Sequence, residues 1–191
     1  TDGYSGYTFL AQKVGLVHLS CWAHARRYFE RALENDRERA SHVMRLIQFL
    51  YAIESMARDQ ELPHDQRHAL RLEKSLPVIN EIGAYLYRHK NNVTPKSPIG
   101  KAFEYCKNRW DSLQNYLTNG MLEIDSNMVE NAIRPLALGR KNYLFAGSHD
   151  AAQDIAMFYS FFGTCKNNDI DPHLWLKYVM DNIHSTPAKD F

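Results

Sequence analysis

The sequence contains one Cys-x-x-His pair, Cys21 and His24, whose residue types could bind a metal ion. A structural zinc site needs about four ligands, and this pair supplies two of them. His149 and His173 lie too far along the chain to complete a recognisable ligand spacing. We therefore interpret Cys21 and His24 as a packed structural pair at the start of a long helix.

Clusters of basic residues could contact phosphate, because arginine carries a fixed charge and a fork of hydrogen-bond donors. Arg26 and Arg27 form one such pair, and Arg140 and Lys141 form another. Between residues 88 and 109 there are six lysines and arginines but a single acidic residue. The alternative for each cluster is an ordinary solvated helix face.

Two acidic residues, Asp2 and Glu130, each allow a purely structural interpretation. Asp2 precedes Gly3, and Asp-Gly is a common turn dipeptide. Glu130 lies three residues after Asn127, as in a capping box, and four residues before Arg134, as in a helix-surface ion pair. Spacing alone favours a turn for Asp2 and a cap or ion pair for Glu130.

The hydrophobic pattern predicts a mainly helical chain. Apolar residues recur every three or four positions from Trp22 to Arg58, which predicts one long helix or two joined near Asn35-Asp36. Trp22 and Phe29 are expected in the core. Further helices are predicted over 63–89 with a kink or break at Pro77, 99–117 with a cap at Asn119-Gly120, 125–138, 150–166 and 171–183. Strand patterns are confined to 15–19 and 141–145.

Composition limits the classes of protein that fit. The chain has 191 residues, of which 45% are hydrophobic and 24% charged, and this suits one medium globular domain or two small ones. No apolar run could span a membrane. Three cysteines are too few for a disulfide framework and favour a reducing compartment, so a cytoplasmic protein is expected. The chain opens on Thr1 without a signal peptide, and we expect it to be a piece of a longer protein.

Several motifs occur together in a distinctive order. They are Thr1-Asp2-Gly3-Tyr4, Cys21-Trp22-Ala23-His24-Ala25-Arg26-Arg27-Tyr28-Phe29, the segment from Ile124 to Pro135, the segment from Gly139 to Ser148, and Thr164-Cys165-Lys166-Asn167-Asn168. Together they closely resemble the insertion sequence 66 (IS66) family of bacterial transposases, over nearly the whole chain. The resemblance implies DNA transposition by a mobile element, which the residue patterns alone do not reach.

The resemblance also implies a catalytic site. DDE transposases have an RNase-H-like core with three carboxylates, and two divalent metal ions, Mg²⁺ or Mn²⁺, stabilise the attacking and leaving oxygens. It places the second carboxylate at Asp2 and the third at Glu130, so both are expected to be catalytic and to bind metal. The first would lie on an earlier strand that this chain lacks, and the chain alone is therefore expected to be inactive.

The same resemblance assigns roles to basic residues and divides the chain. Arg26, Arg27, Arg134, Arg140 and Lys141 are the candidate DNA-binding residues, with residues 139–142 expected in a loop beside the active site. Residues 1–24 are expected to end the core sheet, 25–118 to form a helical insertion, and 119–191 to return to the core. In related DDE transposases a similar Cys-x-x-His arrangement has an architectural role.

Three functions remain open at this point. The first is metal-dependent strand cleavage and transfer by a full-length parent, acting on transposon ends and target DNA as a homo-oligomer, with accessory transposition proteins as possible partners. The second is a DNA-binding or subunit-assembly module without chemistry of its own. The third is a degenerate, inactive copy, because Ser126 and Asn131 stand where the family usually has Asn and Arg.

Overall fold

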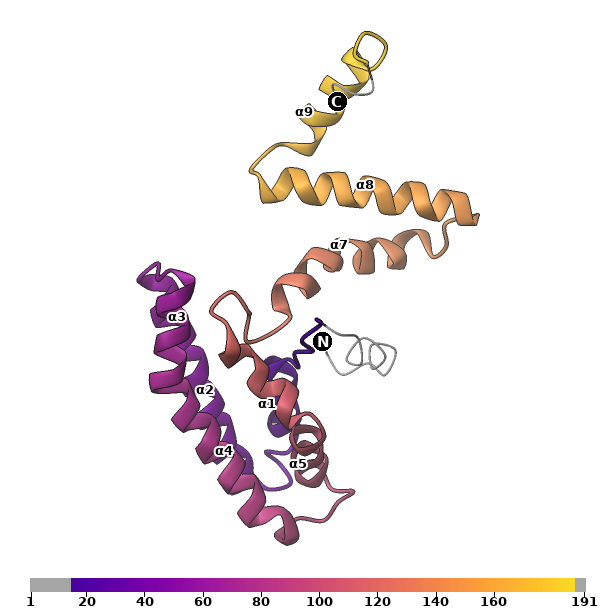
Figure 1. Cartoon of the computed structure of the whole chain (residues 1–191). Helices are drawn as coiled ribbons and strands as arrows, with labels where there is room; N and C mark the ends of the chain where they lie inside the picture. The colour runs from indigo at the N-terminus through magenta and orange to yellow at the C-terminus, as the bar shows by residue number, and fades with distance from the viewer. Residues whose placement is uncertain (1–14, 188–191) are drawn as a thin grey trace. The chain divides into compact units, whose positions relative to one another are not determined.

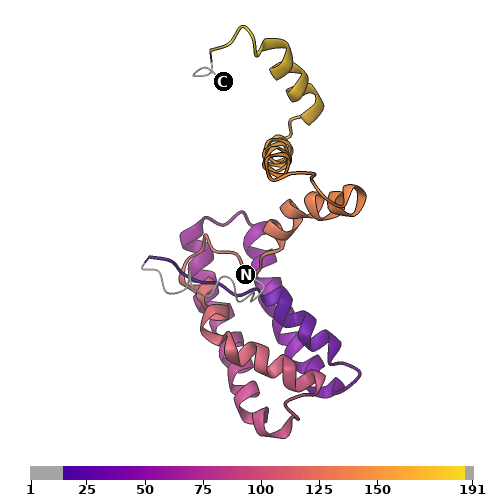
Figure 2. The same ribbon diagram turned by 90° about the vertical axis from the view of Figure 1, so that its right-hand side faces the viewer.

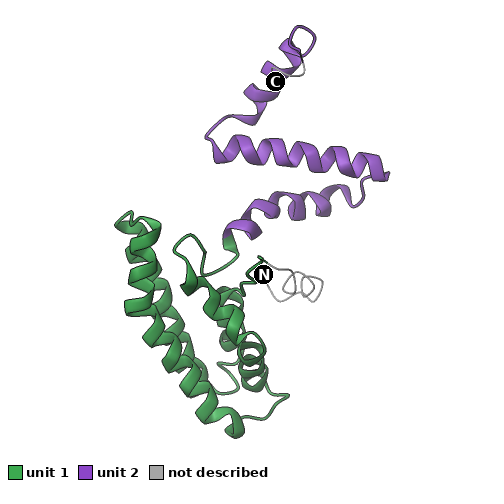
Figure 3. Ribbon diagram, viewed as in Figure 1, with its two compact units in different colours: residues 1–127 green, residues 128–191 purple. Residues whose placement is uncertain are grey.

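The computed structural model describes residues 15–187, and these form helices joined by short turns and loops, with no strand among them. The chain divides into two compact units, Thr1–Asn127 and Met128–Phe191 (Figure 3). Asp2 lies outside the described residues. The mainly α class is confirmed. The predicted domain limits at 24 and 118 remain predictions.

Unit 1 is a bundle of helices in which α2 (Arg37–Asp59) and α4 (Leu76–His89) run antiparallel (Figure 1). Its described helices are α1 (Trp22–Arg31), α2 (Arg37–Asp59), α3 (His64–Leu70), α4 (Leu76–His89), α5 (Pro98–Asn108) and α6 (Trp110–Gln114). A π-helical turn covers Arg71–Ser75, and 3-10 turns cover Lys90–Asn92 and Asn115–Thr118. α1 packs against α2 and α5, and α2 packs against α4. Figure 2 shows the loop from α4 to α5 at the end of the unit away from α3.

The core of unit 1 is built around α1. Trp22 and Phe29 are fully buried, as expected, and lie edge-on to Trp110 and tilted against Phe103 respectively. The indole N–H of Trp22 donates to the Leu113 carbonyl at 2.8 Å, so the one polar atom of this buried ring is paired. These contacts join the start of the unit to residues about 90 positions later.

The predicted breaks between helices occur, each for a local reason. Asp36 separates α1 from α2, and its carboxylate accepts a hydrogen bond from the Arg39 N–H, as an N-cap residue does. Before Pro77 the chain makes the π-helical turn Arg71–Ser75. Proline has no N–H to donate and its ring crowds the preceding turn, so a local change of helical pitch there is expected.

The two strand predictions are wrong within the described residues. A strand needs a neighbouring strand to take its backbone hydrogen bonds, and residues 15–187 supply none. The segment before α1 is instead tied to α6 and the 3-10 turn after it, because Ser20 N–H donates to the Ser112 carbonyl and the Asn115 side chain donates to the His18 carbonyl. Residues 141–143 belong to the last turn of a helix.

Unit 2 contains α7 (Asn127–Tyr143, whose first residue closes unit 1), α8 (His149–Asn167) and α9 (Pro172–Asn182). Ser148 and Asp171 cap α8 and α9 by accepting backbone N–H groups. α7 runs five residues beyond its predicted end and passes through Gly139. This glycine does not end the helix but allows close approach, because a Cβ there would overlap the Tyr159 hydroxyl. Among the described helices, none combines the length and apolarity that crossing a bilayer requires.

Candidate nucleic-acid interface and catalytic helix

Glu130 occupies the first turn of α7 and is half-buried. A carboxylate at this position is favoured by the helix dipole, because the N-terminal end of a helix carries partial positive charge. Arg134 follows four residues later on the same helix and is exposed, so its side chain lies on the same side as Glu130. The two residues are thus about one helical turn apart on α7.

The segment that leads into α7 is held by unit 1. The Tyr51 hydroxyl donates to Asp125 Oδ2 at 2.8 Å, and Asp125 Oδ1 accepts the Asn127 N–H at 2.9 Å. The Trp22 N–H donates to the Ile124 carbonyl, so the starts of α1 and α7 are joined through the backbone. These bonds hold Asn127, the first residue of α7, within unit 1.

A buried ionic network holds the residues just before this segment. The Arg71 guanidinium is fully buried and donates to the backbone carbonyls of Tyr116, Asn119 and Leu122 at 2.7–2.8 Å. Glu54, also fully buried, accepts two further bonds from it. All five guanidinium N–H groups can be used in this arrangement. Arg71 thus fixes the loop that carries the chain from α6 back to α7.

Arg67 extends the network to the surface. It donates to Glu54 at 2.7 Å and to Glu123 at 3.0 Å, and Glu123 is partly exposed. Burial by itself would raise the pKa of Glu54, but the hydrogen bonds and charges of Arg71 and Arg67 outweigh it and hold the pKa below its ordinary value. Glu54 is therefore ionised in the folded protein at neutral pH. Neither this carboxylate nor its partners were found by sequence reasoning.

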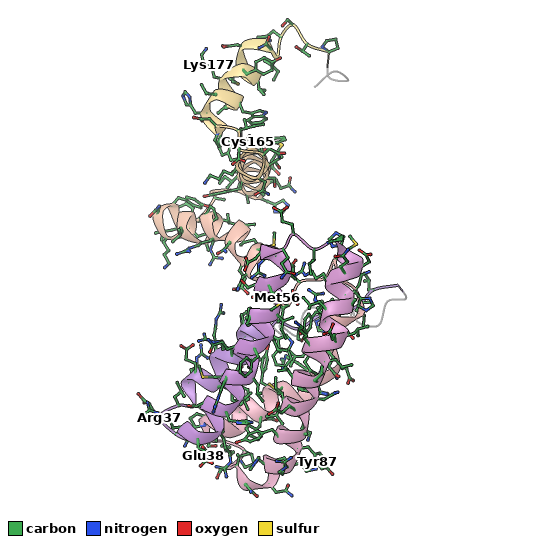
Figure 4. The ribbon with its side chains drawn as sticks, turned by 90° about the vertical axis from the view of Figure 1, so that its left-hand side faces the viewer. Arg37, Glu38, Met56, Tyr87, Cys165 and Lys177 are labelled. Atoms are coloured by element: carbon green, nitrogen blue, oxygen red, sulfur yellow. The ribbon has the colours of Figure 1, made fainter. Side chains whose placement is uncertain are left out.

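A groove of about 1140 Å³ lies along α1 and the first half of α2. Four arginines and two glutamates line it, together with small or flexible polar and apolar residues; the arginines are Arg26, Arg31, Arg37 and Arg45. Arg26 approaches Glu30 at 3.9 Å, with both side chains about half exposed, so this pair is loose and screened by water. The remaining positive charge makes the groove suited to an anionic ligand. Figure 4 shows Arg37 at the beginning of α2.

Of the predicted DNA-binding residues, the structure places Arg26 in this groove. Arg27 does not line the groove, and its guanidinium lies 3.1 Å from the His24 ring.

Arg140 and Lys141 are exposed in the last turn of α7, so the prediction of a loop at 139–142 is wrong. The helix continues to Tyr143 and is followed by Leu144, which has a φ of 60°.

The groove is also lined by Arg31, Arg37 and Arg45, which the sequence alone did not identify. The available signal was the eight-residue spacing of Arg37 and Arg45, which is about two helical turns.

Cys21 is buried within unit 1. It immediately precedes α1, is 1% exposed, and its Sγ accepts the Ser126 N–H at 3.4 Å. Cys21 therefore joins the start of α1 to the residues just before α7. This contact supports the architectural interpretation of the Cys-x-x-His pair.

Comparisons with known proteins now give the class of protein. The family model described as "Transposase IS66 family" matches residues 1–154, and the "IS66 C-terminal element" matches residues 160–191. The protein is thus related to transposases, the enzymes that move DNA segments. More narrowly, the chain belongs to the IS66 family, as its motifs predicted.

Relatives among curated proteins are longer. Uncharacterized protein y4qI of Sinorhizobium fredii is 35% identical over 190 residues, which are 95% of this chain and 35% of that protein. Uncharacterized protein y4jD of the same species is 32% identical over 191 residues, covering 96% of this chain and 37% of its own length. The chain therefore spans little more than a third of the relatives that it matches. No solved structure matches it significantly.

Proposed function

We propose that this chain is part of a DNA transposase whose full-length form cleaves DNA at the ends of a mobile element and joins them to target DNA. The match of residues 1–154 to the IS66 transposase family carries this proposal. The position of Glu130 in the first turn of a helix that unit 1 holds at its start is consistent with it. Strand cleavage and transfer are properties we assign to the longer parent.

Glu130 has the chemistry of a ligand for a divalent metal ion of the Mg²⁺ class. Glu130 offers a hard carboxylate oxygen from a half-buried position, and Asp2, the other proposed ligand, lies outside the described residues. Such an ion, when bound, would polarise a phosphoryl oxygen and lower the pKa of a bound water. Mn²⁺ has the same ligand preference and is the natural substitute.

The chain's own residues would bind and orient the DNA. In this proposal Glu130 binds the ion, and Arg134 holds a phosphate oxygen on the same side of α7 through its fork of donors. Arg140 and Lys141, exposed at the other end of α7, would add phosphate contacts further along the strand. Unit 1 contributes by fixing where α7 begins, through the bonds of Asp125 described above.

The direct test replaces the Glu130 carboxylate with an uncharged amide of nearly the same shape. In the full-length parent, Glu130→Gln should abolish strand transfer while leaving DNA binding intact. Glu81→Gln, at an exposed position of α4, is a matched control and should leave both unchanged. Strand transfer by the Glu130→Gln protein at the parent's rate would overturn the assignment.

A second function is favoured by the groove in unit 1. Because four arginines line one polar groove, the chain by itself would bind the DNA backbone without cutting it. Arg37→Gln with Arg45→Gln should weaken duplex binding and reduce the slope of log K against log salt by about 1 for each phosphate that is no longer bound. Arg58→Gln, exposed on α2 but outside the groove, is the control. An unchanged slope in the double variant would refute the groove as the interface.

We also propose that the parent protein is cytoplasmic, assembles as a homo-oligomer and acts with accessory transposition proteins. Asn131 keeps open the proposal of a degenerate copy, because the family usually has an arginine directly after the glutamate. Asn131→Arg should raise strand transfer by the parent if the missing guanidinium limits it, and an unchanged rate would remove that explanation.

A further inference from the structure

A second cavity in unit 1, of about 790 Å³, differs in chemistry from the arginine groove. It opens between the C-terminal half of α4, the loop after it and α5. Three aromatic side chains, Tyr87, Phe103 and Trp110, line it, and Lys90, Lys107 and Glu104 bring charge to it. Its size lies in the range of sites that hold one small organic ligand.

Two glycines form the walls where chain segments approach most closely. A Cβ on Gly83 would stand 2.7 Å from Cζ2 of Trp110, so the absence of a side chain lets the indole lie close against α4. A Cβ on Gly100 would overlap the backbone carbonyl of Thr94. These close approaches fix part of the cavity wall, at α4 and at the start of α5.

The lining favours a planar ligand with negative charge. Tyr87 is 73% exposed and projects from α4 (Figure 4), so much of its ring is accessible to a ligand. The ammonium group of Lys90 lies over one face of the Tyr87 ring, 3.8 Å from its centre, so a planar ligand would stack on the other face; Lys107 lines the same cavity. Two lysines against the single carboxylate of Glu104 disfavour a cation. Aromatic faces with lysines beside them are the chemistry by which proteins hold unpaired nucleotides.

We infer that this cavity binds an unpaired nucleotide of DNA, with the base against the exposed ring of Tyr87 and the phosphates near Lys90 and Lys107. The inference rests on the proposed function, which makes DNA the ligand. A paired base cannot enter, because its faces are covered by neighbouring bases in the duplex. The cavity would thus recognise a single-stranded or extruded position, whereas the arginine groove would follow the backbone of a duplex.

The test compares three fluorescein-labelled DNAs by anisotropy with the full chain: a blunt 20-base-pair duplex, the same duplex with a four-thymidine 3′ overhang, and the duplex with four unpaired thymidines inside it. Stacking of one base is worth about 1–3 kcal/mol, so both unpaired forms should bind roughly 5- to 150-fold more tightly than the blunt duplex. Equal affinity for all three would overturn the inference and leave duplex binding, and with it the proposed function, intact. Failure to bind any of them would count against the DNA-binding proposal itself.

Variants decide whether this cavity is responsible. Tyr87→Ala should reduce the preference for unpaired DNA to the level of the blunt duplex, and Tyr87→Phe should retain it because the ring face remains. Phe49→Ala removes another large exposed ring, 51% exposed on α2 and outside the cavity, and should change nothing. A preference that survives Tyr87→Ala, or that Phe49→Ala lowers equally, would refute the assignment. Occupation of the cavity by a second copy of the chain would appear as dimerisation that Tyr87→Ala abolishes, and would also refute it.

Discussion

Arg71 and Glu54 form a two-point ion pair in the centre of unit 1, with Arg71 Nε 2.8 Å from Glu54 Oε1 and Arg71 Nη2 2.9 Å from Glu54 Oε2. Both side chains are fully buried. Removal of two charges from water is costly, and here the cost is offset because every polar contact of Arg71 is made, three of them to the loop before α7. The pair therefore joins α2 to the segment that precedes α7.

Removing either partner of this ion pair alone should destabilise unit 1 strongly. Arg71→Met leaves Glu54 buried with Arg67 as its remaining partner, and Glu54→Gln leaves Arg71 without its counter-charge; each should lower the free energy of unfolding by about 3–5 kcal/mol. Denaturation followed by the fluorescence of Trp22 and Trp110, in a Trp175→Phe background, measures unit 1 alone.

The double variant provides the control for that prediction. Because both residues belong to one pair, Arg71→Met with Glu54→Gln should cost clearly less than the sum of the single variants. Additive losses would mean that the two side chains stabilise the fold independently, contrary to the geometry.

The stability of unit 1 should fall in acid through Glu54. Its pKa is lower in the folded than in the unfolded chain, so its contribution is fully present above the ordinary value of 4.5 and is lost as the pH falls through the folded value. The free energy of unfolding should therefore decrease below about pH 4.5. Measured from pH 7 to pH 3, Glu54→Gln should show a flatter profile, and a parallel profile would assign the acid sensitivity to other carboxylates.

Gly120 should not tolerate a side chain. A Cβ at this position would overlap the backbone carbonyl of His64, at the start of α3, and neither backbone segment can move aside easily. Gly120→Ala should cost about 1–3 kcal/mol of unit 1 stability, by the tryptophan-monitored denaturation above. Gly163→Ala, in the interior of α8 with open space around it, should instead stabilise unit 2 by up to about 1 kcal/mol. A neutral Gly120→Ala would disprove the close approach.

The thiol of Cys106 should be inert in the folded protein. It is fully buried, and burial raises its pKa to about 12 although the charge of Arg109 acts in the opposite direction. Because the thiolate is the reactive form, alkylation at pH 8 located by mass spectrometry should leave Cys106 unmodified until denaturant is added. Modification in native conditions at the rate of a free thiol would show that α5 opens readily.

Local sequence determined most of the helices and their ends. The three- and four-residue spacing of apolar side chains predicted α1 and α2 and the burial of Trp22 and Phe29, because a helix can hide only one face. Asp36 and Asp171 cap their helices through local contacts. Their carboxylates accept N–H groups, two or three residues later, that a helix start leaves unpaired. The catalytic assignment of Glu130 came from the resemblance to a family, since its spacing alone favoured a cap or an ion pair.

Only the tertiary structure decided which charged residues are buried and which glycines mark close contacts. Glu54 and Arg71 are 17 residues apart, and Arg71 reaches carbonyls up to 51 residues away, so no local pattern distinguishes them from charges on a solvated helix face. Gly120 was predicted as part of a helix cap but is required by the backbone of α3. Both the arginine groove and the aromatic cavity form where helices meet. The strand prediction at residues 15–19 is wrong because a strand needs a neighbouring strand, and residues 15–187 supply none. Such features depend on partners distant in sequence, which helical periodicity does not encode.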